Sequence, residues 1–335
     1  MSKVNRKQQI LNFIKENGQS SVKALSDHFS ISRQAIHRNI SSLLEDVHIK
    51  KMGSSPKVYY KFIKNLDSSD TIQLHEKVTM SIISKEASKI IKDNFLFITA
   101  SGDIKYGIDA FIYWCDKNKL DVEKTAKDYV KSFKKFQKYR KGDLIDGSYK
   151  IKKTDFDENY MDKIFYIDFY SIERFGKTKL GQLLLYAKQS QNKKLIKDIS
   201  SEIKEKIEKL IKKENIDAIA FIPPTVKREV QFIKELEKNL KINKPKINIV
   251  KIKTPVSVPQ KTLKKLDDRI ENARETFVVD DNRSFKKILL VDDALGSGAT
   301  FNEICKKIKD SKVAKKTICL AITGSFSGFE VISEV

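Results

Sequence analysis

Long apolar runs and paired cysteines are both missing from this sequence. No apolar stretch approaches the roughly 18 residues of a membrane-spanning helix, and the opening residues MSKVNRKQQ lack the hydrophobic segment of a signal peptide. The three cysteines, Cys115, Cys305 and Cys319, are too few for a disulfide framework and lack zinc-site spacing, and the four histidines show no ligand pattern. We therefore expect a cytoplasmic protein with reduced thiols and no membrane contact.

Acidic residues are scarce relative to basic ones. The 335 residues include 66 Lys and Arg against 44 Asp and Glu, which gives a formal net charge of +22. A charge of this size favours polyanionic partners such as nucleic acid. A general lysine bias with a solvated surface is the alternative explanation for part of the excess. The length allows two or three domains.

The first 62 residues have the pattern of a winged helix-turn-helix. Apolar residues recur at helical spacing from Arg6, and Ser21 and Ser32 precede two further helical stripes, as N-cap residues do. Two alternating runs, residues 48–52 and 57–62, are joined by Gly-Ser-Ser-Pro, a composition typical of a hairpin turn. Three helices and a hairpin resemble the small winged-helix domains of bacterial regulators.

The third of these helices would present the surface that reads a nucleic acid. Glutamine pairs with adenine and arginine with guanine in the major groove, and wing lysines contact phosphates. Residues 1–66 carry a net charge of about +8, the sign that phosphate contacts require. A winged helix used only for protein contacts is the alternative. The predicted nucleic-acid contacts are Ser32, Arg33, Gln34, His37, Arg38, Lys51 and Lys57.

Residues 67–150 have the pattern of a mainly helical connecting region. Residues 72–92 show the apolar spacing of one long amphipathic helix, and two further helical segments follow. The run KSFKKFQKYRK, residues 131–141, is compatible with gripping a nucleic-acid strand or with the solvated end of an amphipathic helix. The turn-rich residues 142–148 predict a linker that ends this region.

From about residue 155 strand-like and helix-like segments alternate, which predicts a parallel sheet covered by helices on both faces. Residues 218–222 form one buried apolar run that leads into Pro-Pro-Thr and then a helix from about Lys227. Residues 288–291 form another, followed by two carboxylates, a loop with two glycines and a helix. Ligands of open α/β sheets bind beyond the carboxyl ends of strands, so both turns are expected to line one crevice.

The motif VDDALGSGAT, residues 291–300, has parts with separate chemical uses. Glycines let the backbone approach a ligand, and a helix N-terminus attracts an anion. Adjacent carboxylates accept hydrogen bonds from a vicinal diol, and a diol beside a phosphate describes a ribose 5-phosphate. The motif is neither a P-loop nor a dinucleotide fingerprint, because no Gly-Lys-Ser/Thr follows and the acidic pair precedes the loop. An ordinary strand–turn–helix connection with solvent-facing carboxylates is the alternative.

VDDALGSGAT resembles the phosphoribosyl-pyrophosphate (PRPP) binding motif of type I phosphoribosyltransferases, with Ser297 where that family usually has threonine. The resemblance implies an α/β fold with a phosphoribosyltransferase-like parallel sheet flanked by helices. It also implies Mg²⁺ carried by PRPP near the acidic pair, rather than a metal held directly by the protein. The residues that it assigns to the ribose phosphate are Asp292, Asp293, Ala294, Gly296, Ser297, Gly298, Ala299 and Thr300.

The order of the flanking motifs narrows the resemblance to the competence-factor (ComF-type) branch, over about residues 165–323. FIPPTVKREVQF is similar to that branch's Pro-rich turn, although Glu229 replaces a glycine. A stretch between Thr254 and Ala273 is expected to close over the site. The resemblance assigns Pro224, Thr225, Lys227, Arg228, Lys188 and Arg269 to pyrophosphate binding and catalysis, Gln260 and Asn272 to the hood loop, and Phe326 and Phe329 to the acceptor.

These segments predict three domains, residues 1–66, 67–150 and 151–335, and allow three functions. Fusions of a winged helix with a phosphoribosyltransferase-like domain resemble effectors of bacterial retron anti-phage cassettes. This implies PRPP-dependent glycosyltransferase chemistry, with DNA or RNA–DNA, a reverse transcriptase and its msDNA as partners. A PRPP-sensing transcription regulator without catalysis, as in the purine operon repressor family, is the second function, and an inactive DNA-binding scaffold is the third. The basic regions favour the effector, and a homo-oligomer is compatible with each function.

Overall fold

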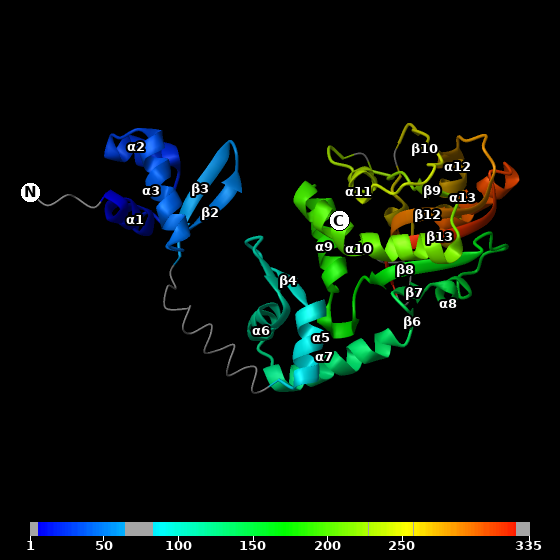
Figure 1. Cartoon of the computed structure of the whole chain (residues 1–335), viewed down its shortest axis with the longest axis horizontal. Coiled ribbons are helices and arrows are strands. Elements are labelled where there is room, and N and C mark those ends of the chain that lie inside the picture. The colour runs from blue at the N-terminus through cyan, green and yellow to red at the C-terminus, as the bar shows by residue number, and fades with distance from the viewer. Residues whose placement is uncertain (1–5, 64–82, 227, 257, 326–335) are drawn as a thin grey trace, which may run out of the picture. The chain divides into compact units, whose positions relative to one another are not determined.

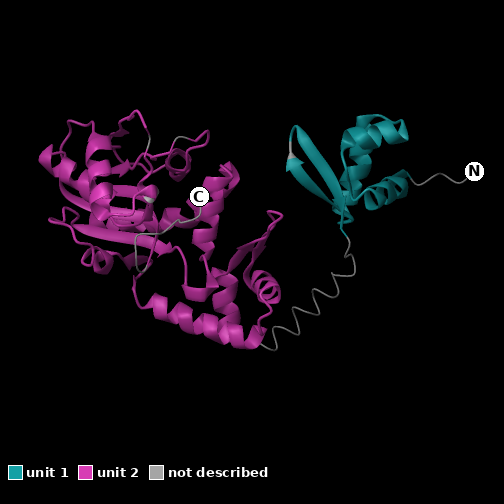
Figure 2. Ribbon diagram, turned by 180° about the vertical axis from the view of Figure 1, so that it is seen from behind, with its two compact units in different colours: residues 1–82 teal, residues 83–335 magenta. Residues whose placement is uncertain are grey.

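The computed structural model describes residues 6–63, 83–226, 228–256 and 258–325. Contacts between residues divide the chain into two compact units, residues 1–82 (unit 1) and 83–335 (unit 2), which Figure 2 shows in different colours. The predicted connecting region, residues 67–150, falls on both sides of this division.

The described part of unit 1 contains three helices and a three-stranded antiparallel sheet, so the predicted helices and hairpin are confirmed (Figure 1). The hydroxyls of Ser21 and Ser32 cap the second and third helices by accepting hydrogen bonds from the Ala24 and Ala35 amides, at 3.1 and 3.3 Å. The elements are α1 (Arg6–Glu16), β1 (Gln19–Ser20), α2 (Val22–Phe29), α3 (Arg33–Glu45), β2 (Ile49–Ser54) and β3 (Lys57–Phe62).

One apolar cluster holds unit 1 together. Its side chains lie three or four residues apart on the helices, because that spacing places them on one face. Strand β3 adds Tyr60, which packs from the sheet. The buried members are Ile10, Leu11, Ile14, Leu25, Ile36, Ile40, Leu43, Ile49 and Tyr60.

Unit 2 is built on a sheet in which six described strands run in the order β6-β7-β8-β13-β12-β9. The last four strands of this order are parallel, and β6 and β7 add an antiparallel edge. The predicted parallel sheet is therefore confirmed as a mostly parallel one. The strands are β6 (Arg140–Lys141), β7 (Leu144–Asp146), β8 (Lys163–Phe169), β9 (Ala218–Phe221), β12 (Phe285–Leu295) and β13 (Ala314–Gly324).

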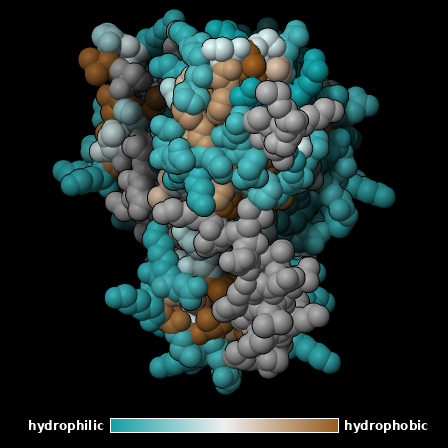
Figure 3. All heavy atoms as spheres, turned by 90° about the vertical axis from the view of Figure 1, so that its left-hand side faces the viewer, coloured by the Kyte–Doolittle hydropathy of each residue, from teal (hydrophilic) through white to brown (hydrophobic). Residues whose placement is uncertain are grey.

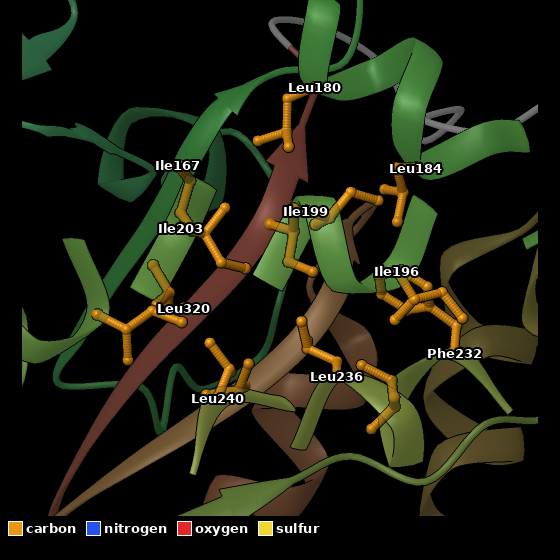
Figure 4. Packing of buried hydrophobic residues seen from close by; sticks show 14 of the residues in the cluster. Ile167, Leu180, Leu184, Ile196, Ile199, Ile203, Phe232, Leu236, Leu240 and Leu320 are labelled. Carbon is orange, nitrogen blue, oxygen red and sulfur yellow. The ribbon is translucent and has the colours of Figure 1, made fainter. Parts of the chain in front are cut away.

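Helices cover both faces of this sheet. Along β12, Leu289 and Val291 belong to one apolar cluster, whereas Ile288 and Leu290 belong to another. A strand buried on both faces requires this uninterrupted apolar run. Figure 4 shows the first cluster, in which helix residues such as Ile199 and Leu236 meet the strands. The first face packs against α9 (Lys179–Gln189), α10 (Lys193–Glu214) and α11 (Phe232–Leu240), and the second against α8 (Ser148–Ile151), α12 (Leu266–Thr276) and α13 (Ala299–Asp310).

Two smaller substructures complete unit 2. Side chains between residues 83 and 130, together with Phe175, form an aromatic-rich cluster, in which Phe95 and Phe111 meet edge to face with ring centroids 5.1 Å apart. A separate antiparallel pair joins β10 to β11. The remaining elements are α5 (Lys85–Asn94), β4 (Leu96–Ile98), β5 (Ile104–Tyr106), α6 (Gly107–Lys117), α7 (Val122–Gln137), η1 (Glu173–Phe175), β10 (Ile249–Lys251), η2 (Gln260–Thr262) and β11 (Phe277–Val279).

The prediction of a linker at residues 142–148 is wrong. Strand β7 lies within this segment and pairs with β8, with Ile145 opposite Tyr166. Ile145 is fully buried, so the segment is part of the core. The turn residues around such a short strand concealed it, because three residues are too few to show an alternating pattern.

Two further predictions for the helical region need correction. The helix predicted over residues 72–92 is not continuous, because Ile83 and Ser84 are non-helical and the Ser84 hydroxyl caps α5. Residues 72–82 lie outside the described chain. The aromatic side chains of the run 131–141 pack on or within the sheet cluster instead of offering a stacking surface. The structure therefore favours the interpretation of this run as the end of an amphipathic helix. Within the described residues, no helix is long and apolar enough to cross a membrane.

Candidate functional site

A cavity of about 430 Å³ lies where β9 and β12 end. This volume falls within the range of about 300–1,000 Å³ that small-molecule sites occupy. Segments from four places in the chain form its wall: α9, the turn after β9, residues 259–277, and the connection from β12 to α13. A site at the carboxyl ends of parallel strands is where an open α/β sheet binds its ligands.

Most of the predicted site residues meet at this cavity. Gln260 lies on the cavity wall and Asn272 does not. The side-chain oxygen of Asn272 accepts a hydrogen bond from the Gln260 side chain. Lys227, Phe326 and Phe329 lie outside the described residues. The predicted residues on the wall are Lys188, Pro224, Thr225, Arg228, Gln260, Arg269, Asp292, Asp293, Ala294, Gly296, Ser297, Gly298, Ala299 and Thr300.

The acidic pair lies on β12 itself, not after it as predicted. Strand β12 continues to Leu295, because its neighbour β13 continues to Gly324 and the two residues are paired in register. Asp292 and Asp293 are the two carboxylates on the cavity wall. The Asp293 amide donates a hydrogen bond to Asp292 Oδ1 at 2.7 Å. The last residues of β12 therefore hold both carboxylates at the carboxyl end of the sheet.

Lys188 from α9 contacts the acidic pair. Its Nζ lies 2.6 Å from Asp293 Oδ2, and about a fifth of each side chain is exposed. Burial and the negative charge of Asp293 raise the pKa of Asp292 well above its usual value, and the Asp293 amide and Lys188 offset part of this shift. Burial and the neighbouring carboxylate therefore make the charged form of Asp292 costly in the folded protein.

The loop from Gly296 to Gly298 lines the cavity and leads into α13. Gly298 has φ +86°, a left-handed conformation that favours glycine, and Ile151 Cδ1 lies 2.6 Å from where a Cβ would be. The Ser297 hydroxyl accepts a hydrogen bond from the Ala299 amide at 3.3 Å. Ala299 and Thr300, the first residues of α13, line the cavity, so the positive end of the helix dipole faces it.

The turn after β9 is held by its own polar side chains. The Arg228 guanidinium donates to the Lys188 carbonyl, and Gln231 Nε2 donates to the Arg228 carbonyl at 3.1 Å. The helix expected from Lys227 begins instead at Phe232, because Gln231 and its partners form the turn before it. Glu229, which replaces the family's glycine, is exposed and does not line the cavity.

Arg269 reaches the cavity from α12 and is only 7% exposed. Its Nε donates to the Leu263 carbonyl at 2.7 Å, and Gln260 Nε2 donates to the Arg269 carbonyl at 2.9 Å. The stretch expected to close over the site is therefore partly helical, and α12 holds Arg269 in place.

Sequence reasoning missed a segment that supports the loop from behind. Ile151 fills the space beside Gly298, and Thr154 Oγ1 donates to the Ser297 carbonyl at 3.4 Å. Lys150 Nζ lies 3.5 Å from the Leu295 carbonyl. These residues are more than 140 positions away from the loop, and no local pattern links the two segments.

The described residues contain no group of three or more His, Cys, Asp or Glu side chains placed to hold a metal ion. Mg²⁺ usually keeps several waters and is bound by one or two carboxylates together with substrate phosphates, so Asp292 and Asp293 fit an ion that arrives with a diphosphate.

The second candidate surface lies on unit 1. Arg33, Gln34, His37 and Arg38 are exposed on α3, as predicted. Ser32 caps this helix, and Lys51 and Lys57 are exposed on the β2–β3 hairpin. On the face shown in Figure 3, hydrophilic side chains predominate and hydrophobic residues form separate small patches.

Comparison with known proteins supports the helix-turn-helix structure of unit 1. Residues 6–60 match the family model described as an HTH domain. No curated protein matches the chain. The match agrees with the three-helix and hairpin structure of unit 1, and a helix-turn-helix domain indicates DNA binding.

Proposed function

We propose that unit 2 binds PRPP or a related ribose phosphate or nucleotide in a type I phosphoribosyltransferase-like fold, while unit 1 holds the protein on nucleic acid. One observation carries this proposal. Residues assigned to the ribose phosphate and the pyrophosphate come from separate segments, yet they line a single cavity of about 430 Å³. An open α/β sheet gathers the turns after its strands at one end, and here those turns carry the residues that the resemblance assigns to the ligand.

Each part of the wall suits one part of the ligand. Asp292 and Asp293 accept hydrogen bonds from the ribose hydroxyls, and the amides that start α13 bind the 5-phosphate. Lys188, Arg228 and Arg269 provide positive charge for a second phosphate group. Magnesium would be carried by the diphosphate near Asp292 and Asp293, as the family resemblance implies.

The proposed role is that of an effector in a bacterial retron-type anti-phage system. In this role, nucleic acid bound by unit 1 localises a PRPP-dependent glycosyl transfer by unit 2. The exposed α3 residues and the charged cavity support a link between nucleic acid and ribose phosphate. Arg269 on the wall is placed to stabilise charge that develops as pyrophosphate leaves.

A PRPP-sensing regulator without catalysis is the second candidate. Arg228 and Gln231 donate to backbone carbonyls of their own turn and its neighbour, which suits a turn that binds without changing during a reaction. In this role PRPP alters the affinity of the protein for DNA and is not consumed.

Calorimetry with PRPP, followed by measurement of released pyrophosphate in the presence of Mg²⁺ and candidate acceptors, tests the proposal. Binding with turnover supports the effector, and tight binding without turnover supports the sensor. If the full-length protein binds neither PRPP nor ribose 5-phosphate, the proposed ligand class is wrong.

A further inference from the structure

Lys150 has an unusual position for a lysine. It lies on α8 and is only 8% exposed. Its Nζ lies 3.5 Å from the Leu295 carbonyl and 3.4 Å from the Ser325 carbonyl, and it also donates to the Ser325 hydroxyl. Leu295 and Gly324 are register partners at the ends of β12 and β13. The buried ammonium therefore joins the carboxyl ends of the two central strands.

Residues 151 and 154, close to Lys150 in sequence, contact the loop at residues 296–298 at two more points. Ile151 packs against Gly298, and Thr154 donates to the Ser297 carbonyl. Lys150, Ile151 and Thr154 are not among the residues that line the cavity, but they contact Leu295, Gly298 and Ser297, which line it. A loop whose carbonyls already accept hydrogen bonds from side chains is held in one conformation. Preorganised anion binding by its amides requires such a fixed loop.

Burying a cation here costs free energy that an apolar residue would not. Burial, together with the nearby positive charge of Arg269, lowers the pKa of Lys150 to about 8. Two buried cations close to one loop repel each other, and an anion bound in that loop would reduce the repulsion. The arrangement is therefore better matched to a loop that holds phosphate than to an empty one.

We propose that Lys150 is a positioning residue of the ribose-phosphate site: it fixes the end of β12 from behind and adds positive charge for the phosphate bound by residues 296–300. This inference rests on the proposed function of unit 2. It assigns a role to a residue outside the cavity wall and outside the motif.

The role predicts that affinity depends on the protonation of Lys150. Arg269 on α12 is the charged group whose field acts on Lys150 together with burial. Lys251, on β10, has a pKa that burial also lowers to about 8. Its effect is common to wild type and Lys150 variants, so the difference between their pH profiles reports Lys150.

Calorimetry with ribose 5-phosphate in metal-free buffer, at about pH 7 and about pH 9, tests the proposal on the full chain. Lys150→Met is expected to bind about tenfold more weakly than wild type at the lower pH, as for the loss of one pKa unit of interaction. Wild type should approach the variant at the higher pH. Lys150→Arg should keep the affinity and lose the pH dependence, and Lys152→Met, an exposed neighbour, should behave as wild type.

Equal affinities and equal pH profiles for wild type and Lys150→Met would overturn the inference while leaving the proposed function intact. If wild type binds neither ribose 5-phosphate nor PRPP, the proposed function fails, and hydrogen exchange of residues 295–300 decides the positioning role. Faster exchange in Lys150→Met than in Lys150→Arg supports it, and unchanged exchange contradicts it. Should Lys150→Met not fold, the wild-type and Lys150→Arg pH profiles give the same decision.

Discussion

The two units place their functional residues in opposite ways. On unit 1, Arg33, Gln34, His37 and Arg38 follow one another along a single helix and are exposed. On unit 2, the cavity residues come from α9, the turn after β9, α12 and the β12–α13 connection, and several are buried. A surface that reads a long polyanion needs exposed charge on one element, whereas a small-molecule site needs a wall on several sides.

The electrostatics of the two units differ for the same reason. The α3 side chains stay in water, where a charge costs little. In unit 2 burial raises the pKa of Asp292 and lowers the pKa of Lys150 to about 8, so both charged forms are less stable there than in solution. Removing a charge from unit 1 should therefore affect binding alone, whereas in unit 2 it should affect binding and stability in opposite directions.

The largest effect is expected from Asp292→Asn combined with Asp293→Asn. The change removes two charged acceptors for ribose hydroxyls, and we expect PRPP affinity to fall on the order of 100-fold or more, measured by calorimetry. Asp310→Asn, at the exposed end of α13, is the matched control and should bind normally.

Asp292→Asn alone tests the stability half of the comparison, because it leaves the ion pair between Lys188 and Asp293 in place. A carboxyl whose pKa is raised by folding loses stabilisation as pH increases through its folded pKa, so the charged form is penalised at neutral pH. Asp292→Asn removes this penalty, and thermal unfolding should show a melting temperature equal to or above that of wild type. A markedly lower melting temperature would mean that the pair is structural.

The next largest effect concerns unit 1. Arg33→Ala combined with Arg38→Ala should weaken DNA binding about 10-fold to 100-fold and reduce the salt dependence by roughly two counterions. Fluorescence anisotropy at several salt concentrations measures both quantities. Lys193→Ala combined with Lys194→Ala removes the same charge from α10 of unit 2. If both double variants lose the same DNA affinity and the same salt dependence, unit 2 contributes as much to DNA binding as α3 does. The contrast between the two units would then be wrong.

Lys188→Met sharpens the assignment within the cavity. If Lys188 contacts the pyrophosphate, the variant should bind PRPP about tenfold more weakly but bind ribose 5-phosphate nearly as well as wild type. The control is Lys179→Met, which breaks an ion pair with Glu202 at the other end of the same helix. An equal loss for both ligands would place Lys188 at the acidic pair only, where it already contacts Asp293.

The smallest effect is the pH dependence of stability. Because folding lowers the pKa of Lys150 to about 8, the unfolded chain binds more protons than the folded chain around that pH, and stability rises with pH. Between about pH 7 and about pH 9 the contribution is on the order of 1 kcal/mol. Denaturant unfolding should show a gain that is larger in wild type than in Lys150→Met by about this amount, because the variant keeps the contribution of Lys251. An identical profile in both proteins would show that Lys150 keeps its ordinary pKa.

Local patterns were enough to predict the elements of unit 1. The N-cap positions of Ser21 and Ser32 and the bounds of α3 could be predicted because capping depends on three or four consecutive residues. The cavity residues of the DDALGSGAT motif could be predicted for a similar reason, since strand, loop and helix are adjacent in sequence. Whether those residues bind PRPP remains a prediction that the experiments above test.

Short elements, and elements whose contacts lie far away in the sequence, could not be predicted from local patterns. Strand β7 is three residues long and is a strand because β8 pairs with it. The helix after β9 begins five residues later than predicted, because Arg228 and Gln231 make turn contacts with carbonyls of Lys188 and Arg228. Such contacts have no counterpart in a local periodicity.

The sequence by itself determined the helical reading surface, the apolar strands and the acid-and-glycine motif, because each depends on residues that are close along the chain. Only the tertiary structure decided that Lys188 would meet Asp293, and that Lys150 would lie behind the loop at residues 296–298. Side chains more than 100 positions apart meet there because the parallel strands end at one edge of the sheet. Their altered charge states follow from burial, which is a property of the folded chain alone.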